Sequence, residues 1–178
     1  MRPADGITVT QEQPCTWQLA GIAGTCDDWK AVPRNRGHEL AVPGVYVYWG
    51  RRPEHTTLSV YVGQTGAVSF RLRDHRKKQS WLRFAIMVYS RASPLDLSLL
   101  RFLEVKLVQR VWHASEREGL RCETREDALP IADERFLGGE RYAPAASLMT
   151  GCCELLTKLA AQVDERDGRL VACCFGDS

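Results

Sequence analysis

The chain lacks the features that mark membrane, secreted and zinc-binding proteins. No apolar run approaches the ~18–20 residues of a membrane-spanning helix, so no membrane partner is expected. Residues 1–10 contain no apolar stretch of signal-peptide length, which favours a cytoplasmic location. The seven cysteines have no C-x-x-C spacing, although Cys152-Cys153 and Cys173-Cys174 are adjacent pairs. We therefore expect reduced thiols that pack as small apolar side chains.

Composition otherwise predicts a single globular domain. The 178 residues are 44% hydrophobic and 26% charged, and the net charge is only +2. The charge is unevenly distributed, because residues 51–91 hold nine basic side chains against Glu54 and Asp74 only. Acidic residues cluster between positions 116 and 134. A basic centre on a near-neutral body is typical of a face that binds a polyanion, although a solvated surface helix would also be charged.

Hydrophobic periodicity predicts an α/β (α+β) domain with a central three-stranded antiparallel sheet flanked by helices. Strands rich in β-branched and aromatic residues are expected at 45–49, 58–62 and 84–89, the first two forming a hairpin. Helices are expected after Gly66, from Ser93-Pro94 onward and over 146–163, with a short one at 25–30. Residues 114–143 show little periodicity and are predicted to be irregular. The expected organisation is an extension (1–42), a core (43–113), and an irregular segment with a C-terminal helix packing on the core (114–178).

Five positions carry a more specific pattern. Gly44-Val45-Tyr46 and Tyr61-Val62-Gly63 lie on the two predicted hairpin strands. Arg71 follows Gly63 by eight residues, His75 follows Arg71 by four, and Glu104 lies in the later helix. A single strand tyrosine is more often a packed aromatic, but the joint occurrence in this order reverses that preference. The pattern resembles the GIY-YIG nuclease family over about residues 43–110.

The resemblance implies an endonuclease that hydrolyses DNA phosphodiester bonds with one divalent cation, Mg²⁺ or Mn²⁺. Tyr46 would accept the proton of the attacking water, and Tyr61 and His75 would orient or assist it. Arg71 would stabilise the phosphoryl oxygens through its forked donors, and Glu104 would bind the metal. Arg71 and His75, four apart on a helix, would share one face of it.

Two sets of residues complete the expected site. Gly44 and Gly63 are the motif glycines. Phosphate-backbone contacts are expected from basic residues of the first helix and, failing those, of the hairpin loop: Arg73, Arg76, Lys77, Lys78, Arg51 and Arg52.

Two alternatives to an active nuclease stay open. The family usually carries an asparagine downstream of the glutamate, whereas the single asparagine here is Asn35. A weakened or inactive nucleic-acid-binding module of the same fold is therefore the main alternative. The other is an interaction protein that binds a partner through its acidic segment at 116–134. Roles in repair, in restriction or defence, and in mobile elements would share the same chemistry.

Overall fold

The computed structural model describes residues 8–11, 18–28, 41–67, 80–92, 94–124 and 138–176. Six strands form one sheet in the order β1-β2-β5-β3-β4-β6. They are β1 (Thr8–Gln11), β2 (Leu19–Thr25), β3 (Gly44–Arg51), β4 (Leu58–Thr65), β5 (Phe84–Ser90) and β6 (Arg121–Cys122). The helices are α2 (Leu97–Glu118), α3 (Gly138–Val163) and α4 (Asp167–Cys173). The mixed α/β class predicted from the sequence is confirmed.

The predicted hairpin forms the middle of this sheet. β3 pairs antiparallel with β4 on one side and with β5 on the other. Val45, Val47 and Trp49 point to one face and Tyr46 and Tyr48 to the other, because successive side chains of a strand alternate. The three predicted strands are therefore antiparallel neighbours.

The prediction of a three-stranded sheet was wrong, because β2 pairs with β5 and β1 pairs with β2. The signal of β2 was hidden by its small residues, which lack the β-branched and aromatic character of a typical strand. Those small residues have a packing role. A Cβ atom on Gly21 would lie 2.4 Å from Leu159 Cδ1 of α3, so the glycine lets α3 approach the sheet closely.

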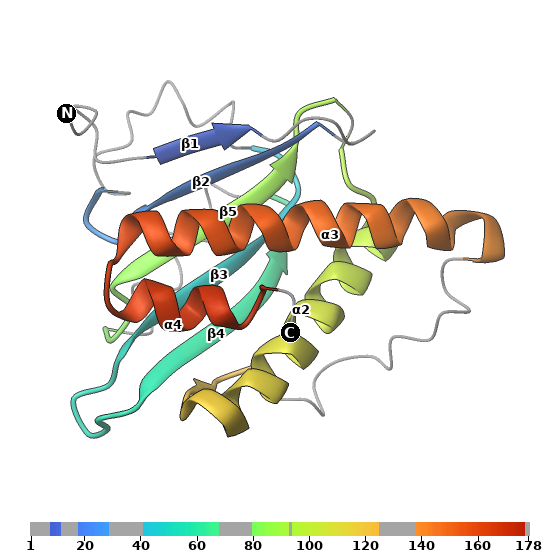
Figure 1. Ribbon diagram of the computed structural model, residues 1–178. Helices are drawn as coiled ribbons and strands as arrows, with labels where there is room; N and C mark the ends of the chain where they lie inside the picture. Colours follow the sequence, from blue (N-terminus) through green and yellow to red (C-terminus); the bar gives the residue numbers. More distant parts are fainter. Residues whose placement is uncertain are drawn as a thin grey trace.

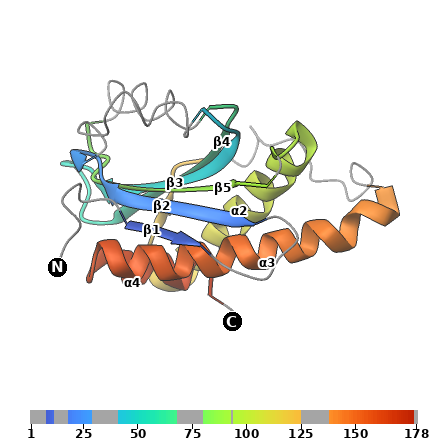
Figure 2. The same ribbon diagram turned by 90° about the horizontal axis from the view of Figure 1, so that it is seen from above.

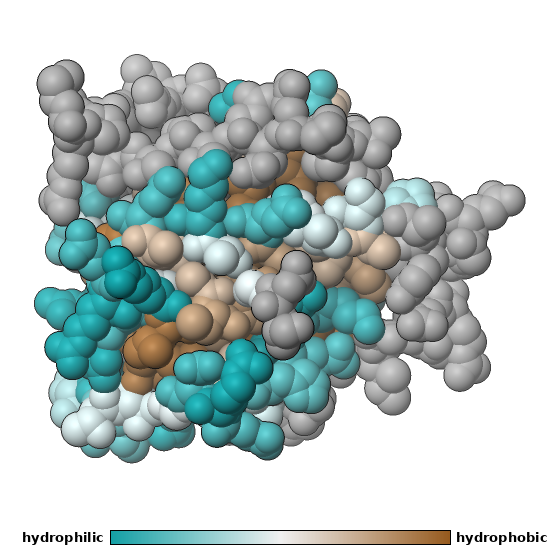
Figure 3. All heavy atoms as spheres, in the orientation of Figure 1, coloured by the Kyte–Doolittle hydropathy of each residue, from teal (hydrophilic) through white to brown (hydrophobic). Residues whose placement is uncertain are grey.

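Helices α2, α3 and α4 lie on one side of the sheet (Figures 1 and 2). Their apolar faces and the residues Val45, Val47, Val60 and Val62 form the larger hydrophobic cluster. The outward surface of this helical layer mixes hydrophobic and hydrophilic residues (Figure 3). A second cluster, which includes Tyr46, Tyr48, Trp81, Met87 and Tyr89, lies on the opposite face of the sheet.

The prediction of irregular structure over 114–143 was wrong for 114–118, 121–122 and 138–143, which are helix or strand. α2 continues to Glu118 and ends at Gly119, whose φ of 66° is the left-handed conformation that glycine adopts most readily. Strand β6 follows, and α3 begins at Gly138 although it contains Pro144. Glycine and proline disfavour helix locally, which is why the pattern predicted a start at 146. Residues 125–137 lie outside the described residues.

Thr25 and Asp96, both expected near helix starts, act as caps in positions that differ from the prediction. Thr25 Oγ1 donates to Asp28 Oδ2 (2.6 Å) and accepts from Asp28 N (3.1 Å), so Thr25 caps a turn. The described part of the helix predicted at 25–30 is only this turn, and residues 29–30 lie outside the described residues. Asp96, expected inside the first turn of the next helix, instead precedes it and accepts from Leu99 N at 2.9 Å. The helix therefore begins at Leu97 rather than at Ser93-Pro94.

Candidate active site

The two glycine-tyrosine tripeptides lie side by side on β3 and β4. Tyr46 is paired with Gly63, and Tyr48 with Tyr61. Since cross-strand partners point to the same face of a sheet, this register brings the tyrosine rings together. The ring centroids of Tyr46 and Tyr61 are 6.1 Å apart, and the rings are nearly parallel. The expected convergence of these two tyrosines is thus a feature of the structure.

Gly63 lies directly under the ring of Tyr46. A Cβ atom at position 63 would lie 2.4 Å from Tyr46 Oη, 2.5 Å from Cζ and 2.8 Å from Cε2. These distances are too short for carbon contacts, so any side chain here would displace the ring. The glycine of the second tripeptide therefore creates the space in which the tyrosine of the first one lies.

Tyr48 belongs to the same group, although the sequence pattern did not select it. Its ring centroid is 4.8 Å from that of Tyr46 and 6.5 Å from that of Tyr61. Tyr46 and Tyr48 are each only 1% exposed, whereas Tyr61 is half-buried. The signal for Tyr48 was its position two residues after Tyr46, which places both rings on one face of the strand.

Glu104 belongs to a different element. It lies on α2 and is half-buried. The buried side chains of α2 pack on the sheet face opposite to the tyrosine rings, so the sheet separates Glu104 from the rings. The first turns of α2 lie level with the end of β4 in Figure 2, where no described strand pairs with the outer edge of β4 at Gly63–Thr65.

A cavity of about 480 Å³ lies at this same end of the hairpin. Its walls are Pro43, Gln64, Thr65 and Gly66 from the strand ends, and Leu95, Leu97 and Leu100 from the start of α2. Glu104 follows Leu100 by one helical turn, because residues four apart on a helix are neighbours. The cavity and Glu104 therefore lie on the helical face, and the tyrosine group lies on the opposite face of the same sheet.

Six of the predicted site residues lie outside the described residues. They are Arg71 and His75 of the proposed catalytic set, and Arg73, Arg76, Lys77 and Lys78 of the proposed DNA-binding set. Their roles stay predictions.

Arg51 and Arg52 are both bonded to carboxylates of the same chain. Arg51 donates to both oxygens of Asp167 at 2.6 and 3.1 Å, and also to Thr56 O. Arg52 donates to both oxygens of Glu123 at 2.7 and 3.1 Å, and its guanidinium lies 5.1 Å from the centre of the Trp81 ring. Bidentate pairs of this kind hold the arginine fork in place.

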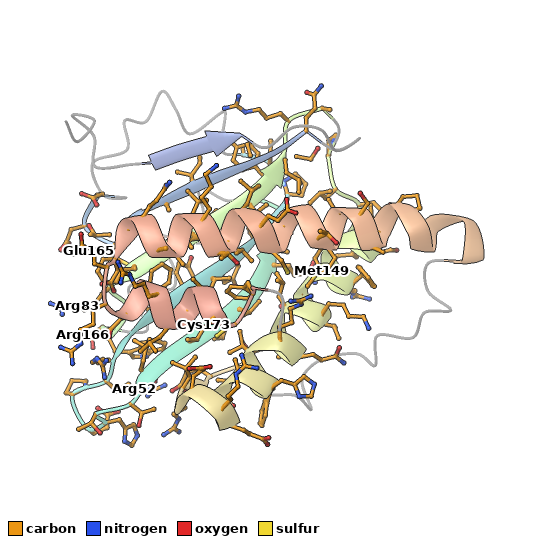
Figure 4. All side chains as sticks on the ribbon, in the orientation of Figure 1. Arg52, Arg83, Met149, Glu165, Arg166 and Cys173 are labelled. Carbon is orange, nitrogen blue, oxygen red and sulfur yellow. The ribbon has the colours of Figure 1, made fainter. Side chains whose placement is uncertain are left out.

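The two arginines lie at the other end of the hairpin from Gly63. Arg51 ends β3 three residues after Tyr48 and five after Tyr46, about 10 and 17 Å at the rise of a strand. Arg52 lies over Trp81, which belongs to the same cluster as Tyr46 and Tyr48. Figure 4 shows Arg52 at the end of the molecule that also carries Arg83 and Arg166. A DNA-binding role for Arg51 and Arg52 would require them to leave their carboxylate partners.

The side chains that could bind a metal ion are few in the described part of the chain. In the residues described, no group of three or more His, Cys, Asp or Glu side chains is arranged to bind a metal. A single carboxylate such as Glu104 suits Mg²⁺, which keeps several waters and takes further ligands from a substrate phosphate. Zn²⁺ and Ca²⁺ would need three or more protein ligands, a group that the described residues do not contain.

Three cysteines lie in the apolar interior. Cys152, Cys153 and Cys174 are buried in the larger hydrophobic cluster, as expected for thiols that pack as apolar side chains. Burial raises the pKa of the Cys174 thiol to about 12 and that of Cys152 well above its ordinary value. Their apolar surroundings therefore keep both thiols in the neutral form.

Comparison of the chain with protein-family models, with curated proteins and with solved structures finds no match. The resemblance to GIY-YIG nucleases therefore rests on the residues themselves and on their arrangement. In the described part of the chain, no helix has the length and apolarity of a membrane span.

Proposed function

We propose that this protein is a divalent-metal-dependent endonuclease that hydrolyses DNA phosphodiester bonds by a GIY-YIG-type mechanism. The observation that carries the proposal is the placement of Tyr46 over Gly63, with its ring beside that of Tyr61. The two tripeptides that define the resemblance are reciprocal parts of one packing arrangement.

The roles follow from what phosphodiester hydrolysis requires. Tyr46 accepts the proton of the attacking water, and Tyr61 and His75 orient or assist it. A free tyrosine has a pKa near 10, so Tyr46 needs a nearby positive charge to act as a base at neutral pH. Arg71 binds the non-bridging oxygens, where charge develops in the transition state. Mg²⁺ held by Glu104 would supply further neutralisation of the phosphate charge.

The second candidate is a nucleic-acid-binding module that keeps the fold without full activity. The burial of Tyr46 favours it, because a side chain that is 1% exposed has little direct access to a substrate. The lack of an asparagine downstream of Glu104 also favours the second candidate. The two candidates differ in one respect, namely metal-dependent cleavage of the DNA that they bind.

Plasmid nicking with Mg²⁺ and with EDTA separates the two candidates. The active nuclease converts supercoiled plasmid to nicked circles only with Mg²⁺. Glu104→Gln should abolish this cleavage and leave DNA affinity largely intact, because the metal-binding charge is lost and the size of the side chain is kept. Glu116→Gln is the matched control, since Glu116 lies on the same helix and is exposed. DNA binding without cleavage by the wild type would favour the second candidate.

Arg71→Ala tests the proposed stabilisation of the phosphoryl oxygens by the Arg71 guanidinium. Removal of a single donor that stabilises a transition state typically lowers the rate by about 10²–10³. We therefore expect Arg71→Ala to lower turnover at saturating DNA by that factor. An unchanged rate would remove Arg71 from the mechanism.

A further inference from the structure

The sheet face that carries Tyr46, Tyr48 and Tyr61 (the tyrosine group) extends towards the hairpin loop. Three cross-strand pairs lie on this face, each two residues along the strands from the next: Gly63 with Tyr46, Tyr61 with Tyr48, and Ser59 with Gly50. The first two pairs contain the tyrosine group. The third pair lies one step beyond it, roughly 7 Å further along the strands.

A nearly buried carboxylate occupies this third position. Glu123 Oε1 accepts a hydrogen bond from Ser59 Oγ at 2.9 Å. Glu123 and Arg121 point to the tyrosine face, because Cys122 between them packs against the cluster on the helical face. The Glu123 side chain is only 10% exposed. A negative charge that is largely removed from water therefore lies one step from Tyr61.

Two guanidinium groups share this carboxylate. Arg52 donates to both oxygens of Glu123, at 2.7 and 3.1 Å, and its guanidinium lies over Trp81, a member of the same cluster as Tyr46. Arg121 Nε lies 3.2 Å from Glu123 Oε1. One negative charge thus holds two positive charges on the tyrosine face. Partly buried charges are screened less by salt and water than exposed ones, so their field extends to neighbouring side chains.

Other titratable groups among the described residues also face this region. Tyr89 belongs to the cluster of Tyr46, and Cys26 packs against it. Glu54 lies 3.6 Å from the Arg52 guanidinium but is exposed, and His55 Nε2 lies 2.9 Å from Arg121 Nη1. Solvent screens the charge of Glu54 more than that of Glu123. We therefore expect the pair of Arg52 and Glu123 to affect the phenols more strongly.

We propose that Arg52 and Glu123 are positioning residues that set the electrostatic potential at the tyrosine group. Arg52 stabilises the phenolate form of Tyr46, and Glu123 holds Arg52 in place and limits its effect. This inference rests on the proposed function, because it assigns the proton transfer to Tyr46. Tyr46 lies two steps, roughly 14 Å, from the pair. At the effective dielectric constant of a partly buried site, one unit charge at that distance shifts an ionisation by about half a unit to one unit of pH.

The test measures turnover at saturating DNA and Mg²⁺ as a function of pH. The rate rises with pH as the base loses its proton. Arg52→Gln removes a positive charge that favours the phenolate, so it should move this rise to higher pH by about half a unit to one unit. Glu123→Gln removes the negative charge and should move the rise to lower pH by a similar amount. A pair that only ties β6 to the hairpin would lower the rate in both variants without shifting the two profiles in opposite directions.

Three further variants separate charge from packing. Arg52→Lys keeps the charge and should keep the wild-type profile. Arg121→Gln removes a positive charge at a side chain that is 50% exposed, and it should move the rise to higher pH with little effect on folding. Asp167→Asn is the matched control, since Asp167 also binds an arginine through both oxygens but belongs to α4 on the other side of the sheet. It should leave the profile unchanged. Circular dichroism establishes that each variant is folded at the assay temperature.

A second measurement does not depend on cleavage. In protein with isotope-labelled tyrosine, the NMR chemical shift of Cζ follows the ionisation of each phenol, and Tyr46→Phe assigns the signal of Tyr46. Opposite shifts in Arg52→Gln and Glu123→Gln are expected here too. Profiles that stay in place, or that move in the same direction, would overturn the inference and leave the proposed nuclease function intact. A wild type that does not cleave DNA would overturn the proposed function, and the NMR titration would then decide whether the pair acts on Tyr46.

Discussion

Gly63→Ala tests the central packing arrangement of the proposed active site. The added Cβ atom would lie 2.4–2.8 Å from three atoms of the Tyr46 ring, and the ring cannot move freely because Tyr48 lies 4.8 Å away on the same face. Overpacking of this kind costs about 1–3 kcal/mol. Alanine recovers about 0.5–1 kcal/mol relative to glycine in a strand interior. The expected net loss is therefore about 1–2 kcal/mol of unfolding free energy.

Thermal unfolding followed by circular dichroism measures this loss. For a chain of this length we expect the Tm to fall by about 2–8 °C. Cleavage should fall more steeply, because a displacement of about 1 Å in an active-site group lowers turnover by about 10²-fold. Gly66→Ala is the control, since its Cβ atom would meet nothing within 4 Å. Gly50→Ala should be the most destabilising of the three, because its Cβ atom would lie 2.0 Å from the backbone oxygen of Trp81.

A double-mutant cycle identifies the cause of the loss. In a Tyr46→Ala background the ring is absent, so Gly63→Ala should be neutral or slightly stabilising. The coupling free energy between the two positions should then be about 1–2 kcal/mol, within the range for residues in contact. A Gly63→Ala protein with wild-type stability and activity, or a coupling near zero, would refute the argument that Gly63 exists to hold Tyr46.

Three further predictions follow from the remaining residues. Tyr46→Phe should lower cleavage by about 10²–10³ and shift the Tm by only a few degrees, because only a hydroxyl is lost; a large fall in stability with activity retained would make Tyr46 a core residue alone. Neutralising Lys77 and Lys78 together should lower the slope of log affinity against log salt by roughly two, with turnover at saturating DNA unchanged, and an unchanged slope would place the DNA path elsewhere. Arg52→Ala should destabilise the fold by about 0.5–1.5 kcal/mol, because the bidentate pair is lost while Glu123 keeps Ser59 and Arg121 as partners, and DNA affinity should stay the same; a fall in affinity at constant stability would show that Arg52 binds phosphate.

The hairpin and the helix that begins near residue 97 were predictable because their signals are local. Alternation of apolar and aromatic residues at 45–49 and 58–62 requires only the period of a strand, and the structure confirms both strands and their pairing. The Thr25 cap was found for the same reason, since it depends on residues three positions apart.

Elements that depend on distant partners were missed or cut short. β2 consists largely of alanine and glycine, and it is a strand because β5 pairs with it and α3 packs over Gly21. α3 starts eight residues before its predicted start, at Gly138 rather than at 146. α4 was not predicted at all, and its Gly168 lies so close to Ala160 that a Cβ atom would approach the Ala160 oxygen to 2.1 Å. Propensity is a weak signal when tertiary packing stabilises a segment.

The candidate site also combines features with a local sequence signal and features that depend on distant contacts. The sequence by itself determined the five pattern positions, their order along the chain and the chemistry that they imply. Only the tertiary structure decided that Tyr48 joins Tyr46, that Arg52 is paired with Glu123, and that Gln64 and Leu100 face one cavity. Strand register and helix packing bring together residues that are far apart in the chain. No local pattern records those contacts, because each depends on the free energy of the whole fold.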